Sequence, residues 1–531
     1  MIVPSGKTGQ LAVFQNDGKG GFKRLSAPGL QEAVTRDQTT VLGFARADGQ
    51  TVLLAGSANY EDGRATGPVL RQYALPAQTI DDTLPVSAAS TGPLAMADVD
   101  GDGDLDLFVG GRVVPGRYPE AASSLLFLNE NGRFKPDSNP SLTGIGLVSA
   151  AVFTDLDGDG DPDLVLACEW GPLRVFRNEG GRLVPWQMPV TLAGASTTLD
   201  RLAGFWNGVT AGDFDGDGRL DIVASNWGRN THRTGRLPWR VYFGDFAGAH
   251  GMEIIEAFHD PAMNKVVPWR ARDAVARSLP AVLEQFTTYR AFGAASVAEL
   301  PGFRAARELQ VNTLDTMVFL NRGDRWEARA LPVEAQFAPA FGLAVADFDG
   351  DGNEDLVLAQ NFFGSEIETS RCDAGRGLLL RGDGEGNFRA LPGQESGLVV
   401  YGEQRGAAVA DFDGDGRADL AITQNRGSTK LWRNTQGRPG LRVSLRGKAA
   451  NRHGIGGVVR LKFGERWGPA RELHAGAGYW SQDSATLLLA TPAGPSQIEV
   501  RWPGGKTTTT AVPESAKEIS VFPDGRIERG H

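Results

Sequence analysis

Repeated hairpins predict an all-β fold for this chain of 531 residues: a seven-bladed β-propeller with a short helical insertion, followed by a small β-sandwich. Three observations support that prediction. An acidic stretch of nine residues occurs five times between apolar segments, and its copies return with a period near 60 residues. Short alternating strands follow a linker at 435–440 that contains Gly and Pro. Hairpin units of this period, rich in glycine, are typical of a radial β architecture.

The acidic stretch reads DVDGDGDLD at 98–106, and every copy has Asp at positions 1, 3, 5 and 9 and Gly at positions 4 and 6. Carboxylates crowded on one tight turn repel one another unless a hard cation neutralises them, and spaced oxygen ligands suit Ca²⁺. The sequence therefore predicts about five bound Ca²⁺ ions. Their predicted carboxylate ligands are Asp98, Asp100, Asp102, Asp106, Asp155, Asp157, Asp159, Asp163, Asp213, Asp215, Asp217, Asp221, Asp347, Asp349, Asp351, Asp355, Asp411, Asp413, Asp415 and Asp419.

Two alternatives compete with a metal loop. An ordinary Asp-Gly hairpin turn explains any single copy, but five copies with four fixed Asp positions favour metal binding. The residues after position 9 are branched and apolar, so each unit is predicted as strand, metal loop, strand. The EF-hand needs a bidentate Glu at position 12. It is excluded because that position holds Val109, Leu166, Ala224, Leu358 and Ile422.

Composition restricts the class of protein. The formal net charge is −10, and the loop carboxylates supply most of the acidic excess, so five Ca²⁺ ions would bring the chain near neutral. No basic run is long enough to follow a phosphate backbone, which argues against a nucleic-acid partner. No apolar run approaches the roughly 18 residues of a membrane span, and residues 1–10 lack the pattern of a secretory signal. Two cysteines, Cys168 and Cys372, are too few for a disulfide framework; of the two remaining alternatives, a pair of free thiols is favoured over a single long-range bridge.

The propeller is predicted to cover residues 1–436. A hairpin at 10–26 matches the outer hairpins of later units, so we expect either a truncated start or a blade completed by the other terminus. Residues 37–85 have the strands of a unit with too few carboxylates, and they predict a metal-free blade. Inner hairpins near residues 41, 94, 150, 208, 343 and 406, together with one degenerate blade within 241–340, give the predicted seven.

A helical insertion is predicted at about 265–300, where it would cap one face of the propeller or pack on its rim. Pro280 marks a second start or a kink in it. Just before the insertion, Asp245 and Glu253 stand at positions 1 and 9 of a loop-like stretch, a weaker candidate for another cation. Apolar residues of the insertion recur with the spacing of one helix face. They are Val275, Leu279, Val282, Leu283 and Phe286.

Beyond the linker, residues 437–531 form a second predicted domain. Its segments LRVSLRG (441–447), GGVVRLKF (456–463) and TLLLATP (486–492) have the length and alternation of short strands. A separate β-sandwich fits a segment of this size and pattern.

The loop-and-strand units resemble the FG-GAP or VCBS repeats of integrin α-subunit propellers and of many bacterial surface proteins. The tail is similar to the ASPIC/UnbV domain in NRHGIGGVVRLKF (451–463), AGAGYWSQDS (475–484) and IEVRWPGGKT (498–507). As a whole the chain resembles the cartilage acidic protein-like family. This resemblance implies a Ca²⁺-bearing propeller, secreted, periplasmic or on the cell surface, in adhesion or matrix roles. It also implies that position 7 of each loop offers a backbone carbonyl to the metal, from Asp104, Asp161, Arg219, Asn353 and Arg417.

Metal loops that join strand 1 to strand 2 crowd one face of a propeller and leave the other connections on the opposite face. Aromatic, Arg and Asn side chains gather in those connections and predict a site for a polar ligand or a peptide. The alternative is that the aromatic rings only wedge between blades. The candidate ligand residues are Trp170, Trp206, Trp227, Arg229, Asn230, His232, Phe362, Phe363, Tyr401, Arg405 and Arg426.

None of the six His stands in a recognisable arrangement of nucleophile and base, so no catalytic residue is predicted. The leading hypothesis is a non-enzymatic extracellular or cell-envelope scaffold that binds a protein or glycan, with Ca²⁺ rigidifying its blades. One alternative is a carbohydrate-active enzyme, a lyase or hydrolase, on the aromatic face. The other is a passive structural module of a larger surface protein.

Overall fold

Each acidic stretch joins the two inner strands of an antiparallel sheet, as the sequence predicts. The inner strands are buried on both sides because their residues are small or branched and apolar, and β8 (Ser90–Ala97) is buried along its whole length. This computed structural model describes residues 1–531 except 65–67, 76–78, 82–86, 249–250, 477 and 531.

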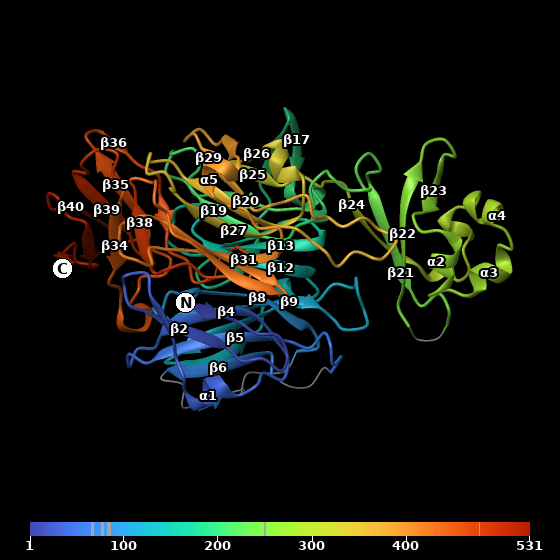
Figure 1. The fold of residues 1–531 in the computed structure, drawn as a ribbon, viewed down its shortest axis with the longest axis horizontal. Coiled ribbons are helices and arrows are strands. Elements are labelled where there is room, and N and C mark those ends of the chain that lie inside the picture. The colour runs from blue at the N-terminus through green and yellow to red at the C-terminus, as the bar shows by residue number, and fades with distance from the viewer. Residues whose placement is uncertain (65–67, 76–78, 82–86, 249–250, 477, 531) are drawn as a thin grey trace.

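Sheets of this kind follow one another around a central axis and form a β-propeller (Figure 1). The inner strand of each sheet contacts the inner strand of the next, in the order β4, β8, β12, β19, β27 and β31. The first sheets contain β4 (Asp37–Ala45), β5 (Thr51–Ala58), β6 (Leu70–Leu75) and β7 (Thr79–Asp81); β8, β9 (Asp106–Val113), β10 (Leu125–Glu130) and β11 (Arg133–Asp137); and β12 (Leu147–Thr154), β13 (Asp163–Gly171), β14 (Arg174–Asn178) and β15 (Leu183–Pro185), with β18 (Gly204–Phe205) beside β13.

The remaining sheets of the ring continue this order. One of them is extended by a hairpin that pairs in parallel with its outer strand. They contain β19 (Val209–Gly212), β20 (Asp221–Ala224), β25 (Met317–Asn321) and β26 (Trp326–Ala330), with the hairpin β16 (Pro189–Leu192) and β17 (Ala195–Thr198); β27 (Ala340–Ala346), β28 (Asp355–Gln360), β29 (Leu378–Gly382) and β30 (Phe388–Leu391); and β31 (Glu403–Ala410), β32 (Asp419–Asn425) and β33 (Gly427–Trp432). Short helices η1 (Pro140–Leu142), η2 (Leu199–Arg201), η5 (Val333–Gln336) and α5 (Gly393–Ser396) lie in the connections.

The predicted hairpin at 10–26 is confirmed as β2 (Ala12–Asn16) and β3 (Phe22–Arg24), which form one sheet with β1 (Ile2–Val3). This sheet lies between the sheets of β4 and β31, because Val13 shares a core with the β4 sheet and the Phe22 ring is 5.7 Å from that of Phe412. A short helix, α1 (Pro28–Gln31), follows it. The predicted total of seven blades stays a prediction.

The degenerate blade expected within 241–340 is wrong in its placement. That region contributes β25 and β26 to the sheet of β19, while the rest folds into a separate sheet beside the ring (Figure 1). The separate sheet has the order β23 (Lys265–Pro268), β22 (Glu253–Asp260), β21 (Trp239–Gly244) and β24 (Arg307–Val311).

The helical insertion covers this separate sheet as three short helices, α2 (Arg272–Ala276), α3 (Ala281–Gln285) and α4 (Tyr289–Gly293), followed by η3 (Val297–Glu299) and η4 (Phe303–Ala305). Pro280 caps α3, so it marks the predicted second start. Val275, Leu279, Val282 and Phe286 pack in one core against the sheet, as predicted. Leu283 does not: it is 45% exposed, because the break at Pro280 changes the direction of the apolar face.

The C-terminal segment is a β-sandwich, as predicted. Apolar residues of its two sheets share one core. One sheet has the order β38 (Thr486–Leu489), β34 (Leu441–Leu445), β41 (Glu518–Val521) and β42 (Ile527–Arg529); the other has β36 (Arg466–Trp467), β35 (Val458–Phe463), β39 (Gln497–Arg501) and β40 (Thr507–Ala511), with β37 (Arg471–Glu472) on β35 and η6 (Ala449–Asn451) before it. The sandwich lies against the ring on the side opposite the separate sheet (Figure 1).

Candidate metal centres and the opposite face

The acidic loops share one backbone design, in which the Asp at position 9 fixes the loop. In the first loop, Asp106 accepts a hydrogen bond from the N–H of Val99 at 2.7 Å and another from the N–H of Asn129 at 2.8 Å. The two bonds tie the loop to its own hairpin and to the third strand of the sheet. The same pair of bonds recurs at Asp163, Asp221, Asp355 and Asp419.

Carboxylate oxygens of each loop gather at one point. Three of them lie within 4.8 Å of one another in every copy. The clusters are formed by Asp98, Asp100 and Asp106; Asp155, Asp157 and Asp159; Asp213, Asp215 and Asp221; Asp347, Asp349 and Asp351; and Asp411, Asp413 and Asp419.

These carboxylates are costly in the folded protein without a cation. Burial raises the pKa of Asp98, Asp155, Asp213 and Asp347 to about 6 in each case. Oδ1 of Asp98 and Oδ1 of Asp213 are buried and have no hydrogen-bond partner in the part of the chain that the structure describes. Oxygen-only ligands with unpaired buried lone pairs fit a hard divalent cation such as Ca²⁺. The residues at position 7 are Asp104, Asp161, Arg219, Asn353 and Arg417, and their predicted carbonyl contacts stay a prediction.

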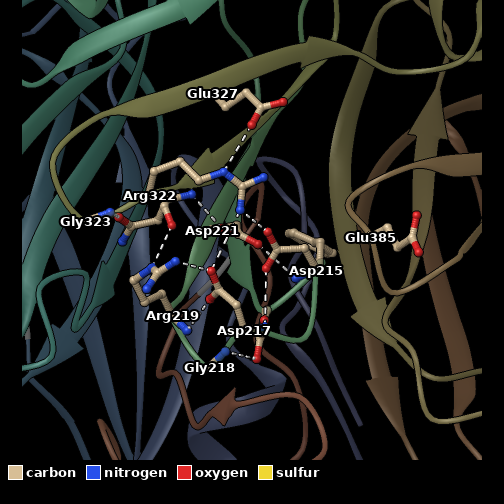
Figure 2. Close-up of polar contacts among 12 residues, drawn as sticks. Asp215, Asp217, Gly218, Arg219, Asp221, Arg322, Gly323, Glu327 and Glu385 are labelled. Carbon is tan, nitrogen blue, oxygen red and sulfur yellow. Dashed lines mark hydrogen bonds and ion pairs between the residues drawn. The ribbon is translucent and has the colours of Figure 1, made fainter.

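Arginines neutralise part of this charge in four of the five loops. Figure 2 shows the third loop, where Arg322 forms an ion pair with Asp215 and Arg219 one with Asp217. Nε of Arg219 also donates to the carbonyl oxygen of Asn321 at 2.8 Å. Among the described residues, no arginine forms an ion pair with the loop at 98–106, where the charge of Lys448 acts on Asp98.

The sandwich covers the loops, and its donors reach the Asp at position 1. Arg501 forms an ion pair with Asp155 at 3.0 Å, and Arg442 forms one with Asp411. The N–H of Ala470 donates to Oδ2 of Asp213 at 2.7 Å. The acidic loops therefore lie in the interface between the ring and the sandwich. This docking was not predicted, because an arginine on a strand carries no local signal of its partner.

A segment of the sandwich, residues 475–484 (the channel segment, with 477 outside the described residues), runs along the axis of the ring. The N–H of Met96 donates to the carbonyl oxygen of Ala475 at 2.8 Å, and the N–H of Gly478 donates to that of Val209 at 3.0 Å. Gln482 exchanges two hydrogen bonds with Gly43 of β4, at 2.7 and 3.1 Å.

Further contacts extend the channel segment to β12, β31 and β27. Nε1 of Trp480 donates to the carbonyl oxygen of Ser149 at 3.1 Å, and the N–H of Val409 donates to Asp483 at 2.7 Å. Gly478, at φ 74°, lies so near β27 that a Cβ atom there would be 2.7 Å from the carbonyl oxygen of Leu343. Every inner strand of the ring from β4 to β31 therefore touches this segment. The two glycines of AGAGYW were the available sequence signal, since glycine permits close backbone approach.

The face opposite the acidic loops holds the predicted ligand residues, most of them engaged with other side chains. The rings of Trp170, Phe205, Trp227 and Phe362 form a chain with centroids 4.6, 5.7 and 5.1 Å apart. Trp206 is fully buried, so it packs in the core rather than facing a ligand. This result agrees with the wedge alternative for that residue.

The polar candidates on this face also have partners. Arg229 forms an ion pair with Asp315, Asn230 donates to the carbonyl oxygen of Phe337 at 3.1 Å, and His232 stacks on Trp269 with centroids 4.5 Å apart. Arg405 forms an ion pair with Glu403 and lies over the ring of Phe341. Arg371 lies over Phe363, Tyr401 is 67% exposed, and Arg426 is exposed with φ at 53°.

A cavity of about 920 Å³ opens on this face, and we call it the mouth cavity. It is bounded by the starts of β4, β8 and β31, by the ends of β9 and β13, and by Tyr479 and Trp480 of the channel segment. Of the predicted ligand residues, Arg405 lines it. Sequence reasoning missed the other lining residues because they come from separate parts of the chain.

Two details complete the earlier expectations. Glu253 accepts the N–H of Phe246 at 2.7 Å, as a position-9 Asp does, but residues 249–250 of that loop lie outside the described residues, and its cation stays a prediction. Cys168 and Cys372 are free and buried. None of the described helices has the length and apolarity to cross a membrane.

Family models match the two parts of the chain separately. The FG-GAP-like repeat model matches residues 98–166 and 155–224, and the FG-GAP repeat model matches 405–437. The model for ASPIC and UnbV matches 447–526. The chain carries FG-GAP repeats and an ASPIC and UnbV domain. The resemblance found in the sequence is thereby confirmed for both parts, while the boundary at 436/437 stays a prediction.

This FG-GAP repeat protein is similar to two curated proteins. It is 31% identical to cartilage acidic protein 1 of Mus musculus and 28% identical to that of Homo sapiens, over 260 residues in each case. The match covers 48% of this chain, and only 35% and 34% of the length of those relatives. Among solved structures, the Dos1 propeller gives a TM-score of 0.32 at 9% identity, covering 89% of this chain and 93% of that one.

Proposed function

We propose that this FG-GAP repeat protein is a Ca²⁺-binding scaffold of the extracellular space or cell envelope, which mediates adhesion by binding a protein or a glycan. The proposal rests on the different features of the two faces of the propeller. One face gathers five carboxylate clusters under the sandwich, and the other presents a cavity.

The metal part of the proposal rests on the donor atoms. Each cluster consists of oxygen atoms, and two buried carboxylate oxygens lack partners. Ca²⁺ bound there would neutralise the loops and hold the inner hairpins in place. It would have this effect in a compartment where free Ca²⁺ is plentiful, which favours a secreted, periplasmic or surface location.

The binding part rests on the state of the side chains on the opposite face. Arg229 and Arg405 are engaged by Asp315 and Glu403, so they are positioned rather than free to act on a substrate. We therefore favour a binding protein over an enzyme. Exposed aromatic and polar groups around a concave site are typical of ligand recognition.

Two measurements test this function on the intact chain. Metal analysis after dialysis against Ca²⁺ should give about five ions per chain, with Mg²⁺ retained less well. Beads coated with the protein should adhere to whole cells or matrix in Ca²⁺ and detach in EDTA. A metal-free protein, or adhesion that is the same in EDTA, would contradict the proposal.

A further inference from the structure

The mouth cavity is built from parts that assemble only in the folded chain. Its floor is the channel segment, where Tyr479 and Trp480 stack with ring centroids 4.7 Å apart and 12° between planes. Trp480 has a φ of 52°, a left-handed conformation that is unfavourable for an aromatic residue. Contacts from the surrounding strands hold it there, including the bond from its indole N–H to the carbonyl oxygen of Ser149. Strain of this kind concentrates at functional sites.

Charge in the cavity lining cancels. Arg112 and Arg405 line the cavity together with two carboxylates, Asp37 and Glu169. Arg112 forms an ion pair with Glu169, and Asp37 accepts the N–H of Lys7 at 2.6 Å. A cavity without excess charge gives no electrostatic gain to an anionic or cationic ligand. This balance favours an uncharged ligand over a charged one.

The cavity lining nevertheless contains hydroxyl groups to which a ligand can hydrogen-bond. The hydroxyl of Thr39 is buried and has no hydrogen-bond partner within the described ranges, and the residue is 3% exposed. Among the described residues, none is hydrogen-bonded to the hydroxyl of Tyr479, although that residue is 6% exposed. A buried polar group without a partner is costly, so a ligand with hydroxyl groups would gain from meeting Thr39. Tyr479 lines the same cavity and brings a second hydroxyl group to it.

Aromatic rings complete the lining. Tyr60 stands at the cavity with 68% of its surface exposed, while Tyr118 lies deeper and donates to Glu169 at 2.7 Å. Sugar rings combine an apolar C–H face, which stacks on aromatic rings, with a rim of hydroxyl groups. A volume of about 920 Å³ is at the upper end for ligand sites and accommodates several sugar units.

We propose that the mouth cavity binds an uncharged oligosaccharide, stacked on Tyr60 at the entrance and hydrogen-bonded to Tyr479 at the floor. The inference rests on the proposed function, because it names the ligand class of the same scaffold. The channel segment thus serves two faces: it fastens the sandwich to the ring and forms the floor of the site.

The test is a binding screen of the full chain, in Ca²⁺, against neutral and acidic oligosaccharides, followed by calorimetry on the strongest binder. Neutral oligosaccharides should bind, and Tyr60→Ala should weaken them by about tenfold through the lost stacking. Tyr479→Phe, which removes only the hydroxyl, should weaken them by about fivefold. Tyr289→Ala is the matched control, since Tyr289 is 60% exposed and lies on α4, outside the cavity.

Binding of acidic oligosaccharides alone would overturn the charge argument. Neutral binding that survives both cavity variants would place the site elsewhere and overturn the proposal, as would the absence of glycan binding together with capture of a protein. Ca²⁺ content and Ca²⁺-dependent adhesion to a protein ligand do not require Tyr60. A protein that keeps both but binds no neutral glycan would therefore refute this inference and leave the scaffold function standing.

Discussion

Replacing Asp213 by Asn should change the stability of the protein in opposite directions with and without Ca²⁺. Asp213 is 1% exposed, and burial raises its pKa from 3.8 to about 6. A shift of this size corresponds to about 3 kcal/mol against the ionised carboxylate at neutral pH, above both pKa values. That cost is already net of the bonds from the N–H groups of Gly218 and Ala470, which favour the ionised form. Asn avoids the cost, so in EDTA the variant should be about 3 kcal/mol more stable.

In Ca²⁺ the effect of Asp213→Asn on the free energy of unfolding should have the opposite sign. A site that binds Ca²⁺ about a thousandfold more weakly loses about 4.1 kcal/mol of ligand stabilisation at saturation, so the variant should then be about 1 kcal/mol less stable than the parent. The assay is thermal and urea unfolding at pH 7.5 in EDTA and in millimolar Ca²⁺. Asp324→Asn is the control, because the side chain of Asp324 is 77% exposed. Equal destabilisation by Asp213→Asn in both conditions would refute the reasoning.

Three other predictions follow from the contacts described. The loop at 98–106, where no described arginine forms an ion pair, should keep its Ca²⁺ longest during stepwise chelation; losing that ion first, as shown by metal analysis of loop variants, would contradict this. Arg501→Gln should leave Asp155 buried beside fewer cations and lower stability in EDTA by about 3 kcal/mol, with a smaller loss in Ca²⁺; an equal loss in both would speak against competition at this carboxylate. Leu279→Ala should lower the free energy of unfolding of the insertion, measured with a chemical denaturant, by about 3 kcal/mol, because Leu279 is 1% exposed. Leu283→Ala should lower it by less than about 1 kcal/mol. Equal losses would contradict the observed packing.

The sequence predicts well those features that depend on residues close together in the chain. The five acidic loops, their flanking strands and the sheet of β4 were found because Asp spacing and apolar runs are local signals. The second start at Pro280 was found for the same reason, since proline changes the backbone at its own position. Leu283 was misplaced because a helical period holds only while the helix continues.

Contacts between distant parts of the chain escaped prediction. The carboxylate of Glu472 accepts the N–H of Asp155, 317 residues away, and nothing in either neighbourhood indicates the other. The candidate ligand residues were predicted only in part for the same reason. Arg405 lines the mouth cavity, while Trp206 belongs to the core. Tyr60, Thr39 and the floor of the cavity come from segments that periodicity treats as unrelated.

The path of the channel segment has a consequence for how the protein is made. The strands of the ring are complete at Trp432, yet the residues that occupy its axis extend to 484, so they leave the ribosome about 50 residues later, on the order of 3–10 s at ordinary rates of synthesis. During that interval the ring has no central support, and its inner strands expose unpaired backbone groups. The nascent ring must then either stay open until its last-made part arrives, or admit that part along the axis after closing. In either case the two domains mature together, and the C-terminal domain acts as the final step in folding the first.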